Sequence, residues 1–384
     1  MIDRKKWMLF VCKIIQKLAI ICPSDKCKLS VEDAESILRD RGYVFQPIFP
    51  SIPPLKERLC DLSLIVPVYN SESFLPKCLE SLCGQKTNCH YEIICINDGS
   101  SDGSLRVLEQ FAKQYKNLKV YTQENRGISA ARNKGIELST GKYIGFIDND
   151  DTVSFNYVQT LLDLARKTNA DIIQCGYTEK THDGILLKET KVKEQVIEKA
   201  DKRKLFKYVQ GYVWSGCFKS DMFENVRFPL GFWYEDMITR MLLMRISNKF
   251  AIVGESLYHK TIHKQNASKR LWKNDNIKAV DQYWLAQQCA EYAQENLCLP
   301  PDELLYNTLL TEWSQFLWGR MRGLPKVIQK SVFILAANNI QKMNFNEGNC
   351  YHPQLQCVLK SFRNKNFNQW RLLSFSMLLK SVAQ

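Results

Sequence analysis

The stretch LSLIVPVYN at residues 62–70 is a continuous apolar run of the kind that forms a strand buried on both faces of a parallel sheet. Three more apolar runs follow it, at YEIICIND (91–98), LKVYTQ (118–123) and KYIGFIDND (142–150). Segments with helical periodicity fill the intervals, at residues 74–82, 101–116 and 129–139. Short strands that alternate with helices predict an α/β fold with a doubly wound, Rossmann-like sheet.

The chain before this core contains one short helix and a linker. The helix is predicted over residues 30–42, with Ser30 as its N-cap, Asp33 three residues later and Gly42 at its end. The segment QPIFPSIPPL (46–55) carries four prolines, which cannot sustain a helix or a central strand. It is therefore predicted to be a linker.

The chain after the core changes character twice. His182-Asp183-Gly184 predicts a hairpin turn within a charged stretch, and from residue 271 onward the pattern is helical. The expected regions are an N-terminal helical extension with its linker (1–60), a catalytic α/β domain (61–265) and a basic helical C-terminal region (266–384).

Composition narrows the class of protein and its compartment. With 45% hydrophobic and 24% charged residues, wholesale disorder is not expected. The formal charge of +13 indicates an anionic partner: nucleic acid, a membrane surface or a phosphorylated substrate. The fourteen cysteines are scattered and form no CxxC pair, which argues against a zinc ribbon. We interpret them as buried thiols of a cytoplasmic protein.

Residues 4–22, RKKWMLFVCKIIQKLAIIC, form a predicted amphipathic helix. One face carries Phe10, Ile14, Leu18 and Ile21, and the other carries Lys6, Lys13 and Lys17. The lysines interrupt the apolar stretch, so neither a secretion signal nor a transmembrane helix is expected. Two interpretations stay open: the helix lies in the plane of a membrane, or it packs on the core of the protein.

Polar residues follow the predicted strands, at the sheet edge where open α/β folds bind ligands. Asp148-Asn149-Asp150-Asp151 places three carboxylates within four residues, and a cation would relieve their repulsion. Oxygen ligands favour Mg²⁺ or Mn²⁺ over zinc, and such an ion would neutralise a leaving phosphate. The alternative is a solvated, aspartate-rich turn.

The second strand ends in Asp98-Gly99, where the carboxylate could accept the imide N–H of a uracil ring or simply cap the next helix. Tyr69 could stack on a base or pack in the core. Arg132 could contact a diphosphate or pair with a carboxylate. The sequence lacks the GxGxxG and GxxxxGK spacings, which counts against a dehydrogenase or a P-loop protein.

Taken together, these motifs resemble glycosyltransferase family 2, the inverting transferases of the GT-A fold. The resemblance rests on LSLIVPVYNSESFLPKCLESLCGQ, YEIICINDGSSDGS, NRGISAARNKGIELSTGKYIGFIDNDD and FWYEDM, in that order, and extends over about residues 61–265. It implies a GT-A catalytic domain with a Rossmann-like mixed sheet. It also implies an enzyme that uses a nucleotide-sugar donor, expected to be a UDP-sugar, and a divalent metal.

The resemblance assigns roles to individual positions. The nucleotide-sugar site would contain Pro67, Tyr69, Asp98, Arg132, Asp148 and Asn149. Asp148 and Asp150 match the DxD motif, with His263 as a further ligand of the Mn²⁺ or Mg²⁺ ion, although a surface histidine is the alternative there. Asp236, beside Glu235, matches the catalytic base, and the preceding Phe232, Trp233 and Tyr234 could form a platform for a sugar ring. The alternative for Glu235-Asp236 is an exposed helix N-terminus, where acidic residues are favoured. The chain departs from the family pattern at Asn97, where many relatives have Asp, and LYHKTIHKQNAS (257–268) keeps only the outline of a family segment.

The last sixth of the chain is strongly basic. Residues 321–384 carry nine Lys and Arg against the single acid Glu347, together with many apolar side chains. One hypothesis is that this tail, with the N-terminal helix, holds the enzyme peripherally on an anionic membrane near a lipid-linked acceptor. The alternative is a basic helical cap on the catalytic domain.

Two other functions compete with sugar transfer to a saccharide or glycolipid acceptor in cell-surface polysaccharide synthesis. One is a catalytically inactive nucleotide- or saccharide-binding relative, against which the joint presence of Asp148, Asp150 and Asp236 argues. The other is nucleic-acid binding, suggested by charge alone. No helix-turn-helix, OB or RNP-type pattern supports that function, so no nucleic-acid partner is expected.

Overall fold

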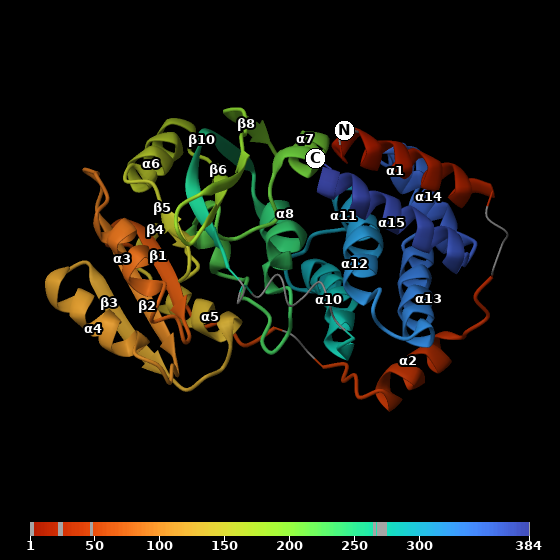
Figure 1. Ribbon diagram of the computed structural model, residues 1–384, viewed down its shortest axis with the longest axis horizontal. Coiled ribbons are helices and arrows are strands. Elements are labelled where there is room, and N and C mark those ends of the chain that lie inside the picture. The colour runs from red at the N-terminus through yellow and green to blue at the C-terminus, as the bar shows by residue number, and fades with distance from the viewer. Residues whose placement is uncertain (1–3, 22–25, 47–48, 264–265, 267–274, 384) are drawn as a thin grey trace. The chain divides into compact units, whose positions relative to one another are not determined.

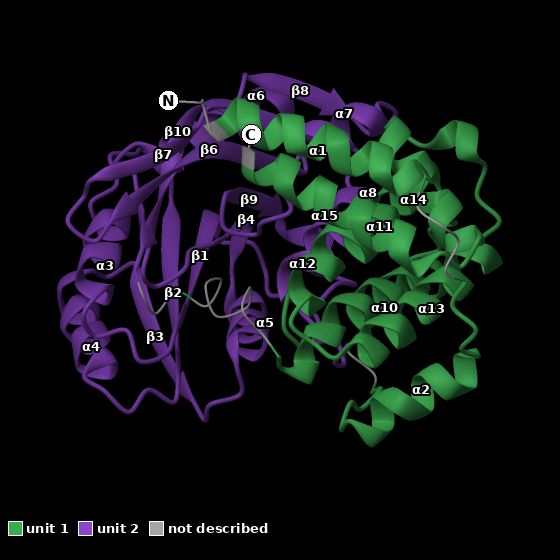
Figure 2. Cartoon of the chain, turned by 45° about the vertical axis from the view of Figure 1, so that its right-hand side comes forward, with its two compact units in different colours: residues 1–47, 232–234, 265–384 green, residues 48–231, 235–264 purple. Residues whose placement is uncertain are grey.

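The computed structural model describes residues 4–21, 26–46, 49–263, 266 and 275–383, which form two compact units (Figures 1 and 2). Unit 1 contains residues 1–47, 232–234 and 265–384, and unit 2 contains residues 48–231 and 235–264. The N-terminal and C-terminal helices, which the sequence suggested as separate regions, thus belong to the same unit.

Unit 2 is built on a ten-stranded sheet in the order β3-β2-β1-β4-β9-β6-β10-β5, with β7 paired to β6 and β8 paired to β10. The strands are β1 (Cys60–Val68), β2 (Tyr91–Asp98), β3 (Leu118–Gln123), β4 (Gly141–Phe146), β5 (Thr152–Val153), β6 (Ile172–Thr181), β7 (Leu186–Thr190), β8 (Gln195–Glu198), β9 (Gly216–Lys219) and β10 (Lys249–Ile262). Strands β1 to β4 pair in parallel, whereas β9 runs antiparallel between β4 and β6, so the sheet is mixed. The α/β class predicted from the sequence is confirmed.

The helices of unit 2 cover both faces of this sheet. They are α3 (Leu75–Cys83), α4 (Ser104–Gln114), α5 (Ile128–Leu138), α6 (Tyr157–Thr168), α7 (Lys202–Tyr208) and α8 (Met244–Ile246), with short segments η1 (Ser220–Phe223), η2 (Glu235–Met237) and η3 (Thr239–Leu243). Successive residues of a strand point to opposite faces. Accordingly Ile93 and Cys95 of β2 pack in the large core with α3, α4 and α6, whereas Ile94 and Ile96 pack with Ala131 of α5.

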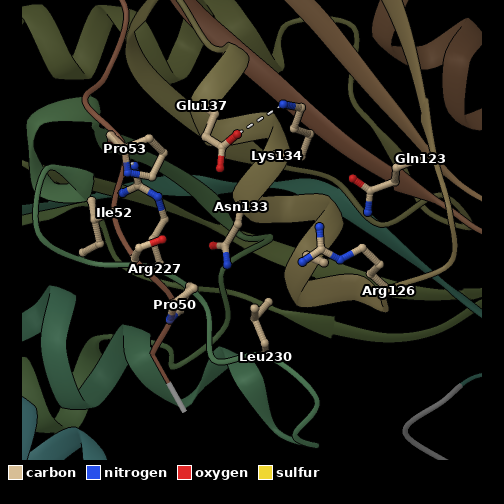
Figure 3. Close-up of a pocket in the computed structure, with 12 residues that line it drawn as sticks. Pro50, Ile52, Pro53, Gln123, Arg126, Asn133, Lys134, Glu137, Arg227 and Leu230 are labelled. Atoms are coloured by element: carbon tan, nitrogen blue, oxygen red, sulfur yellow. Dashed lines mark hydrogen bonds and ion pairs between the residues drawn. The ribbon is translucent and has the colours of Figure 1, made fainter. Parts of the chain in front are cut away.

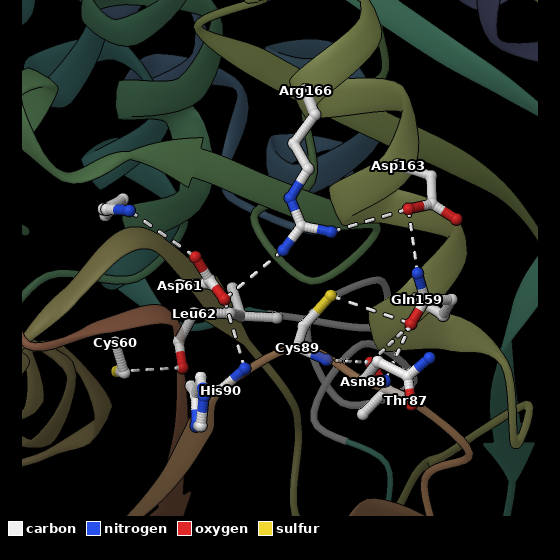
Figure 4. Close-up of polar contacts among 11 residues, drawn as sticks. Cys60, Asp61, Leu62, Thr87, Asn88, Cys89, His90, Gln159, Asp163 and Arg166 are labelled. Atoms are coloured by element: carbon white, nitrogen blue, oxygen red, sulfur yellow. Dashed lines mark hydrogen bonds and ion pairs between the residues drawn. The ribbon is translucent and has the colours of Figure 1, made fainter.

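The ends of the strands away from the site are tied by a polar network (Figure 4). The Asp61 carboxylate, at the start of β1, accepts a hydrogen bond from the His90 backbone N–H (3.1 Å) and pairs with Arg166 of α6 (3.3 Å) and Lys142 of β4 (3.6 Å). These pairs are largely exposed, so each contributes little to stability. The acidic turn predicted to bind a metal ion lies at the opposite, carboxyl ends of the strands.

Unit 1 is helical. Its elements are α1 (Arg4–Ile21), α2 (Val31–Asp40), η4 (Ile277–Val280), α10 (Asp281–Glu295), α11 (Glu303–Thr311), η5 (Glu312–Phe316), α12 (Leu317–Met321), α13 (Lys326–Lys342), η6 (Glu347–Asn349), α14 (Pro353–Arg363) and α15 (Phe367–Ala383). The capping box predicted at Ser30 and Asp33 is present, and Gly42 follows α2 with φ +83°. Among the described residues no helix is long and apolar enough to cross a membrane.

The thirteen described cysteines are all free thiols, and most are buried. Burial raises the pKa of several of them, including that of Cys83 to about 12. The absence of disulfides within the described part of the chain agrees with the interpretation of the cysteines as core residues.

Candidate active site

The three acidic residues after β4 lie on a turn. β4 ends at Phe146, four residues earlier than the apolar run suggested, and Asp148, Asp150 and Asp151 follow it. The Ile147 N–H still donates to the Ile65 carbonyl (3.0 Å), so the turn begins beside the carboxyl end of β1. The carboxylates therefore project from the sheet edge that the sequence indicated.

Arg132 of α5 connects this turn to the segment that contains the predicted base. Its guanidinium donates to Asp148 Oδ1 (3.0 Å) and to Glu235 Oε1 (2.6 Å), and its side chain is buried. Burial alone would lower the pKa of Arg132, but Glu235 and Asp148 outweigh it and the pKa is raised. A permanently charged arginine thus joins carboxylates that are 87 residues apart in the sequence.

Asn149 fixes the turn to the end of β1. Its side-chain N–H donates to the Pro67 carbonyl (2.8 Å), and its side-chain oxygen accepts from the Ser71 hydroxyl (2.7 Å). Tyr69, between these two partners, is exposed. The predicted nucleotide-site residues Pro67, Tyr69 and Asn149 are therefore adjacent, and the Asn149 amide is engaged by protein groups.

Asp150 and His263 form the pair on which the predicted metal site depends. Asp150 Oδ2 lies 2.8 Å from His263 Nε2, and the imidazole stacks on Phe74 with 4.2 Å between ring centroids. Burial and the charge of Asp148 raise the pKa of Asp150, and His263 opposes this shift. The sequence allowed a surface histidine at position 263, but this imidazole is mostly buried.

The described residues contain no group of three or more His, Cys, Asp or Glu side chains that converges as a finished metal site. The Asp150 and His263 pair nevertheless offers oxygen and nitrogen donors that suit Mg²⁺ or Mn²⁺. Burial, and after it the charge of Asp148, raise the pKa of Asp150, and a bound cation would favour the ionised carboxylate against both effects. The donor types therefore fit a divalent ion.

Asp151 holds this turn against β10, a role the sequence did not indicate. Its carboxylate accepts from the Tyr258 hydroxyl (2.7 Å) and from the Thr261 backbone N–H (2.7 Å). The same hydroxyl accepts from the Asp148 backbone N–H (3.2 Å). Burial, followed by the charges of Asp150 and Asp148, raises the pKa of Asp151 well above its usual range. Because His263 directly follows β10, these bonds also position His263.

Asp98 is buried and already bonded within the protein. Its carboxylate accepts from the backbone N–H groups of Arg126 (2.9 Å) and Gly127 (2.8 Å) and from the Gln123 amide (2.8 Å). These bonds fix the turn between β3 and α5. Two carboxylate oxygens carry about four lone-pair sites, so one remains for a ligand. The base-reading role of Asp98 stays a prediction.

The predicted base lies on η2, immediately after Glu235. The charge of Asp236 contributes to the raised pKa of Arg132, which places Asp236 in the same electrostatic environment as Asp148. Of the three aromatic residues before it, Phe232 and Tyr234 are buried and unavailable as a platform for a sugar ring. Tyr212 is exposed instead and stacks on Trp214, with 4.6 Å between ring centroids and 10° between planes.

Comparison with known proteins identifies the family of this chain. Residues 63–225 match the model of "Glycosyl transferase family 2". The chain is 35% identical over 298 residues to the "Putative glycosyltransferase EpsH" of Bacillus subtilis (strain 168), an alignment that covers 71% of this chain and 84% of that protein. The chain belongs to glycosyltransferase family 2.

Solved structures support the fold of this transferase. The crystal structure of S. aureus TarS 1-349 in complex with UDP-GlcNAc superposes with a TM-score of 0.63 at 17% identity, covering 83% of this chain and 91% of that one. The mannosyltransferase PcManGT from Pyrobaculum calidifontis, in complex with GDP-Man and Mn²⁺, gives a TM-score of 0.50 at 13% identity, covering 98% of each chain. The fold is GT-A.

The transferase also has a pocket of about 540 Å³ on the outer face of α5 (Figure 3). Its lining residues are Pro50, Ser51, Ile52, Pro53, Gln123, Arg126, Ala130, Asn133, Lys134, Glu137, Arg227 and Leu230. None of them is a predicted site residue. Two of them contact one, because the Gln123 amide and the Arg126 backbone N–H donate hydrogen bonds to Asp98. Arg227 donates to the Pro53 carbonyl (3.0 Å), which pins the proline-rich segment beside the pocket.

Proposed function

We propose that this transferase is an inverting, metal-dependent enzyme that moves a sugar from a UDP-sugar to a hydroxyl group of a saccharide or lipid-linked saccharide. Membership of family 2 supplies the reaction class. The UDP-GlcNAc complex of TarS, which shares the fold, supports a UDP-sugar as the donor. A relative named "Poly(ribitol-phosphate) beta-glucosyltransferase", 38% identical over 114 residues, supports transfer to an acceptor in bacterial cell-surface polymer synthesis.

The observation that carries the proposal is the double ion pair of Arg132. One arginine holds Asp148, which is itself a predicted metal ligand, and Glu235, which precedes the predicted base. A single displacement needs a base on the side of the anomeric carbon opposite the leaving diphosphate. A rigid connection between the two carboxylate segments supports such an arrangement, because small errors in position cost large factors in rate.

The protein groups divide the work as follows. Asp236 accepts the proton of the acceptor hydroxyl. The oxygen of that hydroxyl attacks the anomeric carbon as the bond between this carbon and the diphosphate oxygen breaks. Tyr69 is exposed and can stack on the uracil ring of the donor. Asp98 keeps one hydrogen-bond acceptor site for the N–H of that ring. Arg132 keeps its charge throughout and holds Asp148 and Glu235 in place.

Asp148, Asp150 and His263 would hold the divalent ion. An ion bound there would offset the charge that develops on the leaving diphosphate. The complex of PcManGT with GDP-Man and Mn²⁺, in a chain of the same fold, supports this choice of ion. The hydrogen bonds of Tyr258 with Asp151 and with the Asp148 backbone N–H keep the turn that carries these ligands in position.

Tyr212 is the candidate for contact with the acceptor sugar. Its ring is exposed and backed by Trp214, so it offers one flat apolar face. Tyr212 is 38% exposed, and the desolvation of its covered part, with a smaller contribution from the charge of Asp236, raises its pKa to about 12. An aromatic face near a general base is a suitable place for the ring that carries the attacking hydroxyl.

The test measures UDP release from a panel of UDP-sugars, with GDP-mannose as the alternative donor, in Mn²⁺, in Mg²⁺ and in chelator. Asp236→Asn should leave donor binding by calorimetry near the parental value and lower turnover by about 10² to 10⁴, the usual contribution of a general base. The matched control is Asp221→Asn, an exposed aspartate of unit 2 that pairs only with Arg58 among the described contacts.

Three results would reject parts of the proposal. Parental turnover by the Asp236→Asn protein would reject the assignment of the base. Full activity in chelator would reject the metal. Tight UDP-sugar binding without any release or transfer would favour a binding protein that has lost catalysis.

A further inference from the structure

Helix α1 has two different apolar faces. One face packs on α15, where Cys12 and Ala19 are buried. The contact includes polar bonds: the Ser376 hydroxyl donates to the Cys12 carbonyl (3.2 Å) and accepts from the Gln16 amide (3.1 Å). This face alone accounts for the position of α1 within unit 1.

The second face is exposed. It consists of Trp7 (53% exposed), Phe10 (61%), Ile14 (42%), Leu18 (48%) and Ile21 (75%), which we call the α1 stripe. These positions recur at helical spacing and form a continuous apolar surface more than 20 Å long at 1.5 Å per residue. Exposed apolar surface of this extent marks an interaction site rather than scattered surface residues.

Basic residues flank the α1 stripe. Lys6, Lys13 and Lys17 are exposed and lie along one side of it, and α1 contains no acidic residue. A helix with an apolar face and a lysine-rich border is the pattern of a helix that lies in the interface of an anionic bilayer. The apolar side chains enter the headgroup boundary, and the lysine side chains reach back to the lipid phosphates.

The basic tail is a weaker candidate for the same role. Its apolar side chains Trp370, Leu373, Met377 and Leu378 are buried in unit 1 and cannot meet a membrane. Two of its basic residues, Lys360 and Arg363, pair with Glu347. The structure therefore moves the membrane hypothesis from the C-terminal tail to α1.

We propose that the α1 stripe docks this transferase in the plane of an anionic lipid bilayer. The purpose of the docking rests on the proposed function: a lipid-linked acceptor stays in the membrane, and an enzyme held there meets it in two dimensions. The docking itself depends only on the apolar stripe and its lysine border.

The test uses the full chain and sedimentation with vesicles of phosphatidylcholine, with and without 30% phosphatidylglycerol. The parental protein should bind the anionic vesicles at least tenfold more tightly than the neutral ones, and 0.5 M salt should remove that preference. Phe10→Ser, Ile14→Ser and Leu18→Ser combined should lower binding at least tenfold. Lys6→Gln, Lys13→Gln and Lys17→Gln combined should abolish the preference for anionic lipid.

The matched control is Ile185→Ser, Leu186→Ser and Leu187→Ser combined, which removes three aliphatic residues of similar exposure (53–63%) from the β6–β7 hairpin. It should bind vesicles like the parental protein. Equal loss in the control and the stripe variant would overturn the proposal. A parental dimer that the stripe substitutions convert to a monomer, with vesicle binding unchanged, would also overturn it and identify the stripe as an interface between copies.

The same proteins separate this proposal from the proposed function. With a water-soluble acceptor, the stripe variant should release UDP at the parental rate. Vesicle binding without transfer from any donor would reject the enzyme while leaving the docking intact. Sugar transfer without vesicle binding would reject the docking and leave the proposed function intact.

Discussion

Arg132 shows how a single buried side chain can determine the geometry of this site. Its charge is neutralised twice, by Asp148 and Glu235, and its burial makes both ion pairs costly to break. Removing one partner of a buried pair leaves a desolvated charge behind, which is worse than removing both.

Arg132→Met should therefore lower the free energy of unfolding by about 3 to 5 kcal/mol and turnover by at least tenfold, because two carboxylates lose their shared counter-ion. Urea denaturation and UDP release measure the two effects. Arg106→Met is the matched control, since Arg106 pairs with Glu72 on the surface, and it should cost about 1 kcal/mol or less. Similar losses of unfolding free energy in both variants would show that the ion pairs of Arg132 stabilise the protein no more than an exposed surface pair does.

At the scale of elements, the turn between β3 and α5 is fixed by its backbone. Gly127 has φ +85° and donates its N–H to Asp98, and a Cβ added there would meet no atom within 4 Å. Only the backbone conformation therefore opposes a side chain at this position.

Gly127→Ala should lower the free energy of unfolding by about 1 to 3 kcal/mol, because φ +85° with ψ 165° lies in a region that is essentially restricted to glycine. It should also weaken UDP binding, because the turn carries the bonds that orient Asp98. Gly184→Ala is the control: this glycine has φ +88° in the β6–β7 hairpin and equally open space. It should show the same stability loss with unchanged UDP binding by calorimetry, and a parallel loss of UDP affinity in both variants would contradict the role of the turn.

The elements that could be predicted from sequence are those whose signal is local. The apolar runs that became β1 to β4, the helices between them, the capping box at Ser30 and the hairpin at Gly184 are all confirmed. β9 is only four residues long and exists because β4 and β6 supply partners on both sides. β10 changes register near Ser256, which no alternation of side chains indicates.

The candidate site followed the same rule. The acidic turn after β4 could be placed from its position at a strand end. The Arg132 contact with Glu235 could not, because it joins residues 103 positions apart. The roles of Asp151 and Tyr258 were missed for the same reason, although a third carboxylate in Asp148-Asn149-Asp150-Asp151 was a signal of an acidic side chain with a separate partner.

At the scale of the whole molecule, one buried carboxyl group of unit 1, that of Asp281, makes the stability of the protein depend on pH. Asp281 is buried, accepts from the Tyr43 hydroxyl (3.1 Å) and the Trp233 backbone N–H (2.9 Å), and burial raises its pKa to about 6. Between pH 4 and 6 the folded protein keeps a proton on Asp281 that the unfolded chain has lost. The contribution of this group to stability therefore falls as the pH rises.

Asp281→Asn should remove this dependence, because an asparagine can keep both contacts if the Tyr43 hydroxyl turns to accept. Relative to the parental protein, the variant should become more stable by up to about 3 kcal/mol as the pH rises from 4 to 7, the equivalent of about two pKa units. Chemical denaturation at several pH values measures this difference. A difference that does not change with pH would mean that Asp281 titrates normally.

The course of the chain between the two units has a practical consequence for anyone who wishes to isolate the catalytic part. Phe232 to Tyr234 belong to unit 1, where Trp233 bonds Asp281 and the Arg320 guanidinium lies 3.4 Å from the ring centroid of Tyr234. Glu235 and Asp236 belong to unit 2. A fragment that ends at residue 265 would lack Asp281 and Arg320, which contact Trp233 and Tyr234 just before the predicted base. The rings of Phe232 and Tyr234, buried in the full chain, would become more exposed to water. Because Trp233 and Tyr234 depend on these contacts within unit 1, inactivity of a fragment that ends at residue 265 would not argue against the chemistry assigned to the full chain.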